Sequence, residues 1–462
     1  MNIYIPIEVK ARELEGKVLV ALVAAERGHS VVLGGKEDTL GLARSGLLKP
    51  GIVHDTALTP STGQVEALRD LVRNGHVITS QDEEHGLLDE SYDTFARVRF
   101  SAETNSMASG ILCWGAHDAG ALRNLYGFGN GNAIVETGSP RVDFWRREFA
   151  PYYAAYHERL MARLGDFVLV SSNFGTLLNV RRFWELLRLR RESNQLVDTE
   201  SEYEMYREAG WLMGLLSEYV RMIRVLASTQ TGIRVVVRPH PTETEDAWRM
   251  LIGDCPNAVV TSEGTLSTWI RGAKALVHNG CTSGFEAAVS GVPRIAYMPV
   301  RSTYERTVPN RVSYRAGSLD ELLAAVQAVL DGGSLENRAP GSGDVAAILR
   351  DRFANLDGPL AADRIVDEWQ RLASGSLEGT NDWASVRRAC LKRRIRRRIS
   401  RVVYGTRRTK TGRSPSITSH KFPDISDSEM RTIITNLRSS LGRFQNVTHD
   451  RIGERSFVFR SA

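Results

Sequence analysis

The chain has 462 residues, of which 42% are hydrophobic and 25% charged, and its formal net charge is +6. This length is too great for one ordinary core and predicts two domains, and the composition is that of a soluble globular protein. No run of about 18 apolar residues occurs, which argues against a membrane-spanning helix, and the first residues lack a secretory signal pattern. The sequence therefore predicts a cytoplasmic protein.

The cysteines form no motif, and the positive charge is concentrated in one segment. The four cysteines, Cys113, Cys255, Cys281 and Cys390, are scattered without a Cys-x-x-Cys pair. They predict reduced, mostly buried thiols, and we expect no disulfide framework, no zinc site and no cofactor. Residues 387–413 contain thirteen Lys or Arg and no Asp or Glu, so the rest of the chain is net negative. The basic character belongs to this one segment.

Strands and helices alternate through the first part of the chain at the spacing of βαβ units. We expect a strand at 2–7, a helix at 14–28 and a strand at 29–35, followed by strands at 51–55 and 75–81 around a helix at 62–75. After a helical bridge near 148–165, a second alternating series begins at the strand 166–175. It continues through 232–241 and 274–299 to a helix at 319–333.

These patterns predict an α/β fold of two facing, doubly wound Rossmann-like domains with a C-terminal basic helical extension. We assign 1–150 to an N-terminal domain and 151–344 to a C-terminal domain. Residues 345–380 are closing helices and a linker. Residues 381–462 are a basic amphipathic helix and a tail with a final helix and strand.

Ligands of such sheets bind beyond the carboxyl ends of the strands, so residues there are the candidates. In the second domain Arg238, His240 and Pro241 follow a β-branched strand, and the flanking prolines fix the direction of His240. Arg and His can donate to a phosphate, although a capped strand end with a structural His fits the same pattern.

A strand, a small-residue turn and a helix start follow at 275–291. Backbone N–H groups with the hydroxyls of Thr282 and Ser283 predict an anion site, with Asn279 just before them. Glu286 in the first helical turn could accept a ribose hydroxyl, or could be a favourable charge near the helix N-terminus. Together with His240, this pattern favours a nucleotide monophosphate or diphosphate.

In the first domain three adjacent acids, Asp82, Glu83 and Glu84, end a strand and precede His85 and Gly86. Their repulsion could raise a pKa, which suits a general base or a nucleophile, although a solvated loop or a Mg²⁺ site remains open. Other candidate substrate contacts, which could equally be salt-bridged loop residues, are Lys10, Arg12, Glu13, Arg141, Asp143 and Asn173.

As a set, the motifs resemble bacterial surface carbohydrate biosynthesis proteins over roughly residues 1–310. The segments that carry the likeness are the first βαβ unit, then "QDEEHG", "VETGSPRVDF", "SSNFG", "RPHPTE" and "VHNGCTSGFEAAVSGVPRIAYMP". More distantly, the acidic and His-Pro motifs resemble those of bacterial polysialyltransferases and capsule Kdo transferases. Those are metal-independent GT-B glycosyltransferases that use CMP-activated acidic sugars. The resemblance therefore implies a GT-B-like fold, with 1–150 as the acceptor-side domain and 151–344 as the nucleotide-sugar-binding domain.

The resemblance implies roles for individual residues. His240 and Pro241 would bind the CMP nucleotide, Thr282 and Ser283 would lie near the donor phosphate or carboxylate, and the acids would supply the base or nucleophile. The chain departs from the pattern at His85, which stands where Gly would follow the acids. This leaves open which acid is catalytic, with Glu84 preferred and Glu83 next, and whether the chemistry inverts or retains.

The implied function is a glycosyltransferase of surface polysaccharide biosynthesis that moves a sugar, such as one carried by CMP, to a glycan or lipid-linked acceptor. The alternatives are a polyol-phosphate transferase using a donor such as CDP-glycerol, a nucleotide-sugar epimerase, and a non-catalytic assembly factor. The sequence does not name the donor sugar, the acceptor or the linkage.

The basic segment adds a prediction about location. In 387–413 the residues Leu391, Ile395, Ile399 and Val402 form one apolar stripe among arginines. A basic amphipathic helix is typical of a membrane-surface element, so we expect a peripheral protein at the inner membrane. The segment has little aromatic interleaving and no RNA-binding motif, so nucleic acid is not the expected partner, and a solvated or acceptor-binding face remains open.

Overall fold

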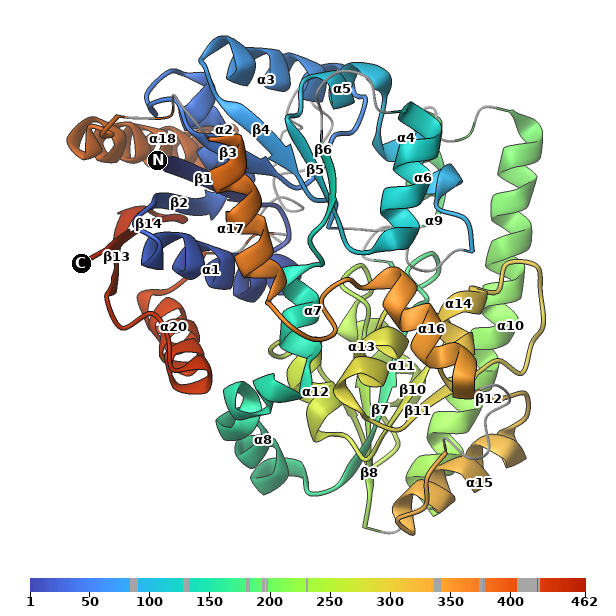
Figure 1. Ribbon diagram of the computed structural model, residues 1–462. Helices are drawn as coiled ribbons and strands as arrows, with labels where there is room; N and C mark the ends of the chain where they lie inside the picture. Colours follow the sequence, from blue (N-terminus) through green and yellow to red (C-terminus); the bar gives the residue numbers. More distant parts are fainter. Residues whose placement is uncertain are drawn as a thin grey trace. The chain divides into compact units, whose positions relative to one another are not determined.

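In the computed structural model the chain divides into two compact units. Unit 1 contains Met1–Gly86, Ser91–Tyr152 and Arg350–Ala462, and unit 2 contains Leu87–Glu90 and Tyr153–Leu349. The structure describes residues 1–83, 90–127, 133–179, 183–192, 196, 198–229, 232–335, 342–373, 377, 379–404, 422 and 424–462, without the side chains of 342–343 and 397–404. Each unit is built on its own sheet (Figure 1).

Unit 1 has an eight-stranded sheet in its described part, in the order β13-β14-β2-β1-β3-β4-β5-β6. The strands are β1 (Asn2–Ile7), β2 (Ser30–Gly35), β3 (Ile52–Asp55), β4 (Val77–Ser80), β5 (Gly110–Cys113), β6 (Ala133–Glu136), β13 (Val447–Gly453) and β14 (Ser456–Ser461). The first six pair in parallel, whereas β14 pairs antiparallel with β2 and with β13.

The helices of unit 1 connect and cover these strands. They are α1 (Lys10–Glu26), α2 (Lys36–Arg44), α3 (Thr62–Arg73), α4 (Asp93–Arg99), α5 (Ala102–Ser106), α6 (Ala116–Tyr126), α7 (Pro140–Trp145), the 3₁₀ helix η1 (Arg147–Phe149), α17 (Ala361–Leu372), α18 (Trp383–Tyr404) and α20 (Asp427–Leu441). Two helices cross the boundary between the units, α8 (Ala150–Leu164) and α16 (Ser342–Arg352).

Unit 2 has a six-stranded, fully parallel sheet in the order β12-β11-β10-β7-β8-β9. The strands are β7 (Phe167–Ser171), β8 (Arg234–Arg238), β9 (Ala258–Val260), β10 (Ala275–His278), β11 (Arg294–Tyr297) and β12 (Tyr314–Ala316). The helices are α9 (Phe183–Glu192), α10 (Thr199–Thr229), α11 (Glu245–Ile252), α12 (Leu266–Gly272), α13 (Ser283–Ser290), α14 (Thr307–Arg311) and α15 (Leu319–Leu330).

The buried strands explain why both sheets form. Every residue of β1 and β7 is buried, as expected for parallel strands covered on both faces. Helix α1 is buried along most of its length, and α7, α17 and α20 contact it within unit 1. The two Rossmann-like sheets predicted from the alternating pattern are therefore confirmed. No helix of the described residues is long and apolar enough to cross a membrane.

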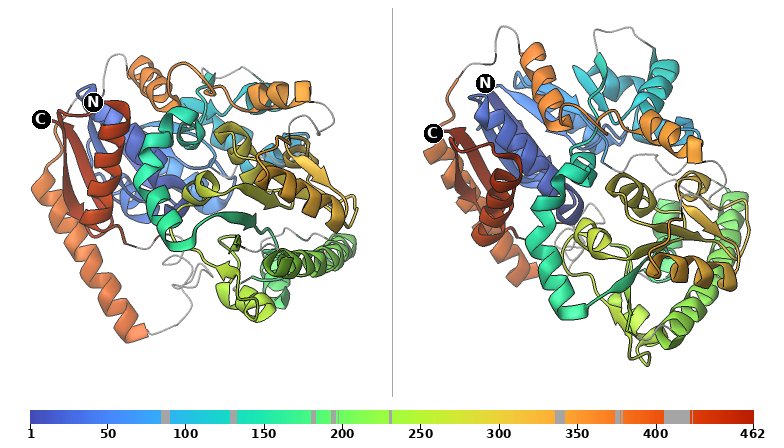
Figure 2. Two further views of the ribbon diagram at one scale, coloured as in Figure 1. Left: turned by 90° about the horizontal axis from the view of Figure 1, so that it is seen from below. Right: turned by 60° about the horizontal axis from the view of Figure 1, so that its bottom comes forward.

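The C-terminal part differs from the prediction of separate closing and tail segments. Residues from Arg350 onward belong to unit 1, where α17 lies along α1 and the strands β13 and β14 extend the sheet beyond β2 (Figure 2). The strand β13 was not predicted, because its sequence "VTHDRIG" is largely polar and only its pairing with β14 makes it a strand.

Gly34 permits this extension of the sheet. A Cβ atom on Gly34 would lie 2.6 Å from Ser456 Oγ and 2.7 Å from the carbonyl oxygen of Arg455, so a larger side chain would push β14 away from β2. The glycine at the end of β2 thus serves the close approach of two backbones.

We expect Gly34→Val to lower the free energy of unfolding by about 1–3 kcal/mol, because the new side chain overpacks the β2–β14 contact. Gly63→Val is the control with the same substitution, since a Cβ at Gly63 meets no atom within 4 Å. Urea titration followed by circular dichroism checks both. Equal midpoints for Gly34→Val and the wild-type protein would show that β14 does not depend on this contact.

Candidate functional site

The strand order of unit 2 places three loops at one edge of its sheet. The chain enters the sheet at β7, adds β8 and β9 on one side, and then adds β10, β11 and β12 on the other. In doubly wound sheets, ligands bind beyond the carboxyl ends of the strands where the order reverses, which here is at β7 and β10. We call the loops 172–179, 239–244 and 279–282, which follow β7, β8 and β10, the strand-end loops (Figure 1).

His240 is oriented by its own loop. Its Nδ1 accepts the backbone N–H of Thr242 at 3.3 Å and lies 2.8 Å from Thr242 Oγ1. With Nδ1 as acceptor, the neutral imidazole carries its proton on Nε2, which is then the nitrogen that can donate. Gly175 of the first strand-end loop comes close to this turn, because a Cβ there would lie 2.4 Å from Thr242 Oγ1.

Glu243 joins the first two strand-end loops, and its role was not predicted from the sequence. Its carboxylate is buried and accepts hydrogen bonds from Ser172 Oγ at 2.6 Å, the Phe174 N–H at 2.5 Å and Trp248 Nε1 at 2.7 Å. Burial raises the pKa of Glu243 while these hydrogen bonds oppose the rise. The only sequence signal was a carboxylate two residues after Pro241 of the His-Pro motif.

Further backbone contacts hold the same two loops in register. Asn179 and Glu243 form an isolated β-bridge, and the Thr244 N–H donates to the carbonyl of Leu178 at 3.1 Å. The first two strand-end loops are thus tied at both ends.

The third strand-end loop is connected to the first through two asparagines. Asn279 Nδ2 donates to the carbonyl oxygen of Asn173 at 3.3 Å. The other amide atom, Asn279 Oδ1, is buried and accepts no hydrogen bond from the described residues. A buried amide oxygen without a donor costs free energy, so this atom is a candidate ligand contact.

Of the predicted hydroxyl pair, only Thr282 is partly exposed. Thr282 is half-buried, precedes α13 and makes no side-chain capping bond. Ser283 is buried, with its Oγ 2.5 Å from Cys281 Sγ. Glu286 is also buried, and its charge acts on the guanidinium of Arg271, whose pKa is lowered by burial.

Arg238 does not have the predicted phosphate-binding arrangement. Its guanidinium donates to the carbonyl oxygens of Thr261, Glu263 and Gly264 at 3.2, 2.6 and 3.0 Å, and it lies over the Trp269 ring. Burial lowers its pKa to about 10. Arg238 anchors the loop after β9, because its donors are directed at that loop's carbonyls.

In unit 1, Glu83 belongs to a buried cluster with Glu13 and Lys17. Lys17 Nζ donates to the Pro6 carbonyl at 2.7 Å and to Glu13 Oε2 at 2.9 Å, and it lies 3.8 Å from Glu83 Oε1. Glu83 Oε2 has no hydrogen-bond partner among the described residues. Sequence analysis missed Lys17, although it follows Glu13 by one helical turn.

The pKa values of the two carboxyl groups in this cluster are shifted in opposite directions. Burial raises the pKa of Glu83, and the nearby Glu13 charge adds to the rise, while Lys17, Arg141 and Arg12 oppose it. Burial would also raise the pKa of Glu13, but the charges of Lys17 and Arg12 and the backbone hydrogen bonds outweigh it and lower the pKa. Glu13 is therefore the ionised partner of Lys17, and Glu83 is the carboxyl group that can hold or release a proton.

The other two acids of the motif are not equivalent to Glu83. Asp82 accepts a hydrogen bond from Arg99 Nε at 2.7 Å, and its carbonyl accepts one from Trp114 Nε1 at 3.0 Å, so it links β4 to its neighbours. Glu84, the preferred catalytic residue, lies outside the described residues. Among the described residues no group of three or more His, Cys, Asp or Glu side chains could hold a metal ion.

Three of the remaining candidates in unit 1 are engaged in its packing. Asp143 is fully buried and accepts the N–H groups of Ala361 and Ala362 and Asn355 Nδ2, so it caps α17, and burial raises its pKa to about 7. Lys10 Nζ binds Glu429 and the carbonyl of Asp424. These contacts correct the prediction that Asp143, Lys10 and Glu13 touch substrate.

Arg141 and Arg12 lie beside the Glu83 cluster. Arg141 donates to the Glu83 carbonyl at 3.3 Å and lies over the rings of Trp114 and Trp145. Arg12 lies 3.4 Å from Glu13 Oε1. Both arginines keep positive charge next to the carboxyl group of Glu83.

Comparisons with known proteins give structural neighbours and no family. The chain matches no protein-family model and no curated protein. It is similar to the crystal structure of a putative UDP-N-acetylglucosamine 2-epimerase from Listeria monocytogenes, with 14% identity, a TM-score of 0.49, and coverage of 81% of this chain and 97% of that chain. The resemblance to polysialyltransferases and Kdo transferases stays a prediction.

Two other similar structures are also enzymes of bacterial glycans. One is UDP-GlcNAc 2-epimerase from Neisseria meningitidis bound to UDP-GlcNAc, at 10% identity and a TM-score of 0.45, covering 80% of this chain and 100% of that one. The other is the wall teichoic acid polymerase TagF, at 13% identity and a TM-score of 0.41, covering 66% and 70%. At such scores these likenesses assign no activity to this chain.

We expect Glu83→Gln to gain stability relative to the wild-type protein as pH rises. The pKa of Glu83 is raised in the folded state, so the protonated carboxyl group stabilises the fold fully below the unfolded pKa, and this stability is lost as pH rises through the folded pKa. Glutamine stays neutral throughout. Urea titrations at pH 5 and pH 8 measure the difference, with exposed Glu66→Gln as control. A difference that does not change with pH would contradict the raised pKa.

Proposed function

We propose that this chain is a glycosyltransferase that moves a sugar from a nucleotide-activated donor, such as a CMP-activated acidic sugar, to a glycan or lipid-linked acceptor. The observation that carries the proposal is the set of strand-end loops in unit 2, which Glu243 and the Asn173–Asn279 contact hold together at the reversal of strand order. Such an edge is the usual nucleotide position in a doubly wound sheet.

The loops offer donors suited to a nucleotide. His240, which carries its proton on Nε2, donates a hydrogen bond to a phosphate of the nucleotide sugar. Thr282 and the backbone at the start of α13 bind a second anionic oxygen. Asn279 Oδ1 accepts a hydrogen bond from a hydroxyl or amino group of the nucleotide sugar. As the bond between the anomeric carbon and the phosphate oxygen breaks, these groups stabilise the negative charge on the departing nucleotide.

The acidic motif of unit 1 supplies the second half of the chemistry. Glu83, or Glu84 beside it in the sequence, takes the proton of the acceptor hydroxyl as that oxygen attacks the anomeric carbon, or itself attacks that carbon if the reaction retains configuration. The raised pKa of Glu83 suits a base that must hold a proton after the transfer. Lys17 and Arg141 limit the rise so that the carboxylate form remains accessible.

The proposed place of the reaction is the inner-membrane surface, where a lipid-linked acceptor would lie, with the basic segment 387–413 as the contact. Residues 405–413 of that segment lie outside the described residues.

We expect His240→Ala to weaken binding of CMP at least tenfold, because a hydrogen bond to a charged phosphate is worth roughly 1.5–3 kcal/mol. Isothermal titration calorimetry of the full chain with CMP, CDP and UDP measures this, and His449→Ala on β13 is the control. Binding of UDP alone would favour the epimerase, and binding of no nucleotide would favour an assembly factor. Equal CMP affinity of His240→Ala and the wild-type protein would show that His240 does not bind the nucleotide.

We expect Glu83→Gln or Glu84→Gln to slow transfer by about 10²–10⁴-fold while CMP affinity is kept, because the base acts on the acceptor rather than on the nucleotide. Release of CMP from CMP-sialic acid and CMP-Kdo in the presence of acceptor is the measurement, with exposed Glu103→Gln as control. Wild-type rates in both variants would exclude the acidic motif from catalysis.

A further inference from the structure

Helix α18 is fixed to unit 1 by one of its faces. Val386 is fully buried in the core of unit 1, and Cys390 packs against the same cluster one turn later. Arg393 donates to the carbonyl of Asp38 at 3.1 Å and fills the space beside Gly41 of α2. These contacts set the rotation of the helix about its axis, and therefore which residues face outward.

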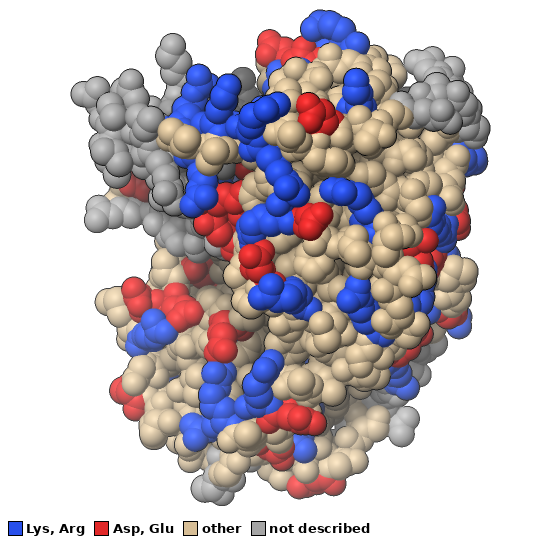
Figure 3. All heavy atoms as spheres, turned by 90° about the vertical axis from the view of Figure 1, so that its left-hand side faces the viewer, with Lys and Arg blue, Asp and Glu red and all other residues tan. Residues whose placement is uncertain are grey.

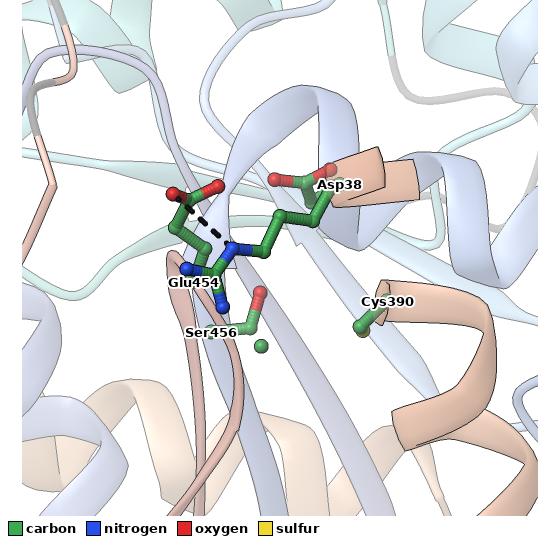
Figure 4. A pocket seen from close by; sticks show the side chains of 6 residues that line it. Asp38, Cys390, Glu454 and Ser456 are labelled. Atoms are coloured by element: carbon green, nitrogen blue, oxygen red, sulfur yellow. Dashed lines mark ion pairs between the residues drawn. The ribbon is translucent and has the colours of Figure 1, made fainter. Parts of the chain in front are cut away.

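A second contact joins α18 to the turn between β13 and β14. Asp38, Cys390, Glu454 and Ser456 surround a cavity of about 10 Å³, which is at most the room of one water molecule (Figure 4). Arg394 lies 3.7 Å from Glu454 on the same side. Arg393 and Arg394 thus interact with other residues of unit 1.

The part of α18 that is not packed exposes apolar side chains between cations, and Leu391 lies at its edge, where it also lines a surface hollow with Cys390 and Arg394. Leu391 and Ile395 are 54% and 49% exposed, and they lie one turn apart in a single row. Arg388, Lys392 and Arg396 are exposed and form a neighbouring row with the same spacing. Exposed aliphatic side chains in a helix that is already packed on its other face are not explained by the core of unit 1.

The charge of this helix is of one sign. Helix α18 contains no Asp or Glu. On the face of the molecule that carries α18 and the β13–β14 hairpin, Lys and Arg side chains gather in the upper part (Figure 3). A surface of this kind is complementary to a sheet of negative charge.

We propose that the outward face of α18 binds a membrane surface that contains anionic phospholipids. Leu391 and Ile395 enter the boundary between headgroups and acyl chains, and Arg388, Lys392 and Arg396 lie against the lipid phosphates. Nucleic acid would also attract the cations but would leave the two aliphatic side chains without a partner. The inference rests on the proposed place of the enzyme at the inner membrane, and it adds which side chains make the contact.

The test measures binding of the full chain to vesicles of phosphatidylglycerol and phosphatidylcholine in equal parts, without nucleotide, by flotation. Arg388→Gln/Lys392→Gln/Arg396→Gln should weaken binding by about 100-fold, since each cation near an anionic leaflet contributes roughly fivefold. Arg69→Gln/Arg73→Gln/Arg221→Gln, which removes the same charge from exposed positions outside α18, should change it much less.

A second variant separates apolar insertion from charge. Leu391→Ser/Ile395→Ser should bind weakly at low salt and not at all at high salt, because only screened electrostatic attraction remains. Unchanged thermal unfolding shows that each variant is folded. The proposal fails if this variant binds vesicles like the wild-type protein at every salt concentration, if the charge-matched control loses as much binding as the α18 variant, or if the chain binds a DNA duplex and no vesicles. Vesicle binding is read without sugar transfer, so it stands or falls separately from the enzymatic proposal.

Discussion

The buried carboxylate of Glu243 is the interaction on which the candidate nucleotide site depends. It is taken out of water, and the hydroxyl, backbone and indole donors around it compensate for the lost hydration. Those donors come from the loop after β7 and from α11, so the charge holds two segments about seventy residues apart in sequence at a fixed separation. The direction of His240 follows, because the turn that orients its ring ends at Glu243.

In unit 1, too, a buried acid that accepts backbone hydrogen bonds joins segments that are far apart in the sequence. Asp143 caps α17 and brings the chain back to the N-terminal sheet after it has built unit 2. The strands β13 and β14 then extend that sheet at β2, where Gly34 leaves room for the backbone. Glu83 differs from these acids, because Lys17 lies at 3.8 Å from one of its oxygens and the other oxygen has no partner among the described residues. This incomplete satisfaction is what makes Glu83 a candidate for proton transfer.

Much of the fold was readable from the sequence, and the candidate site was readable only in part. Alternating apolar segments and helical periods predicted both sheets, because parallel strands and their helices leave a local pattern. The strand-end rule directed attention to His240, Asn279 and Thr282. It could not separate them from Arg238, Ser283 and Asp143, which also follow strands, although Arg238 binds loop carbonyls, Ser283 lies against Cys281 and Asp143 caps α17. Whether a polar side chain faces a ligand or a neighbouring loop depends on contacts between distant segments.

The sequence by itself determined the two Rossmann-like sheets, the sheet edges at which ligands would lie and the concentration of positive charge in one helix. Each of these depends on local composition and spacing along the chain. Only the tertiary structure decided that the C-terminal strands complete the first sheet, that Glu243 and Lys17 belong to the candidate sites, and that Leu391 and Ile395 face outward while Val386 is buried. The physical reason is that burial and hydrogen-bond partners are properties of packed surfaces, and the residues that form those surfaces are far apart along the chain.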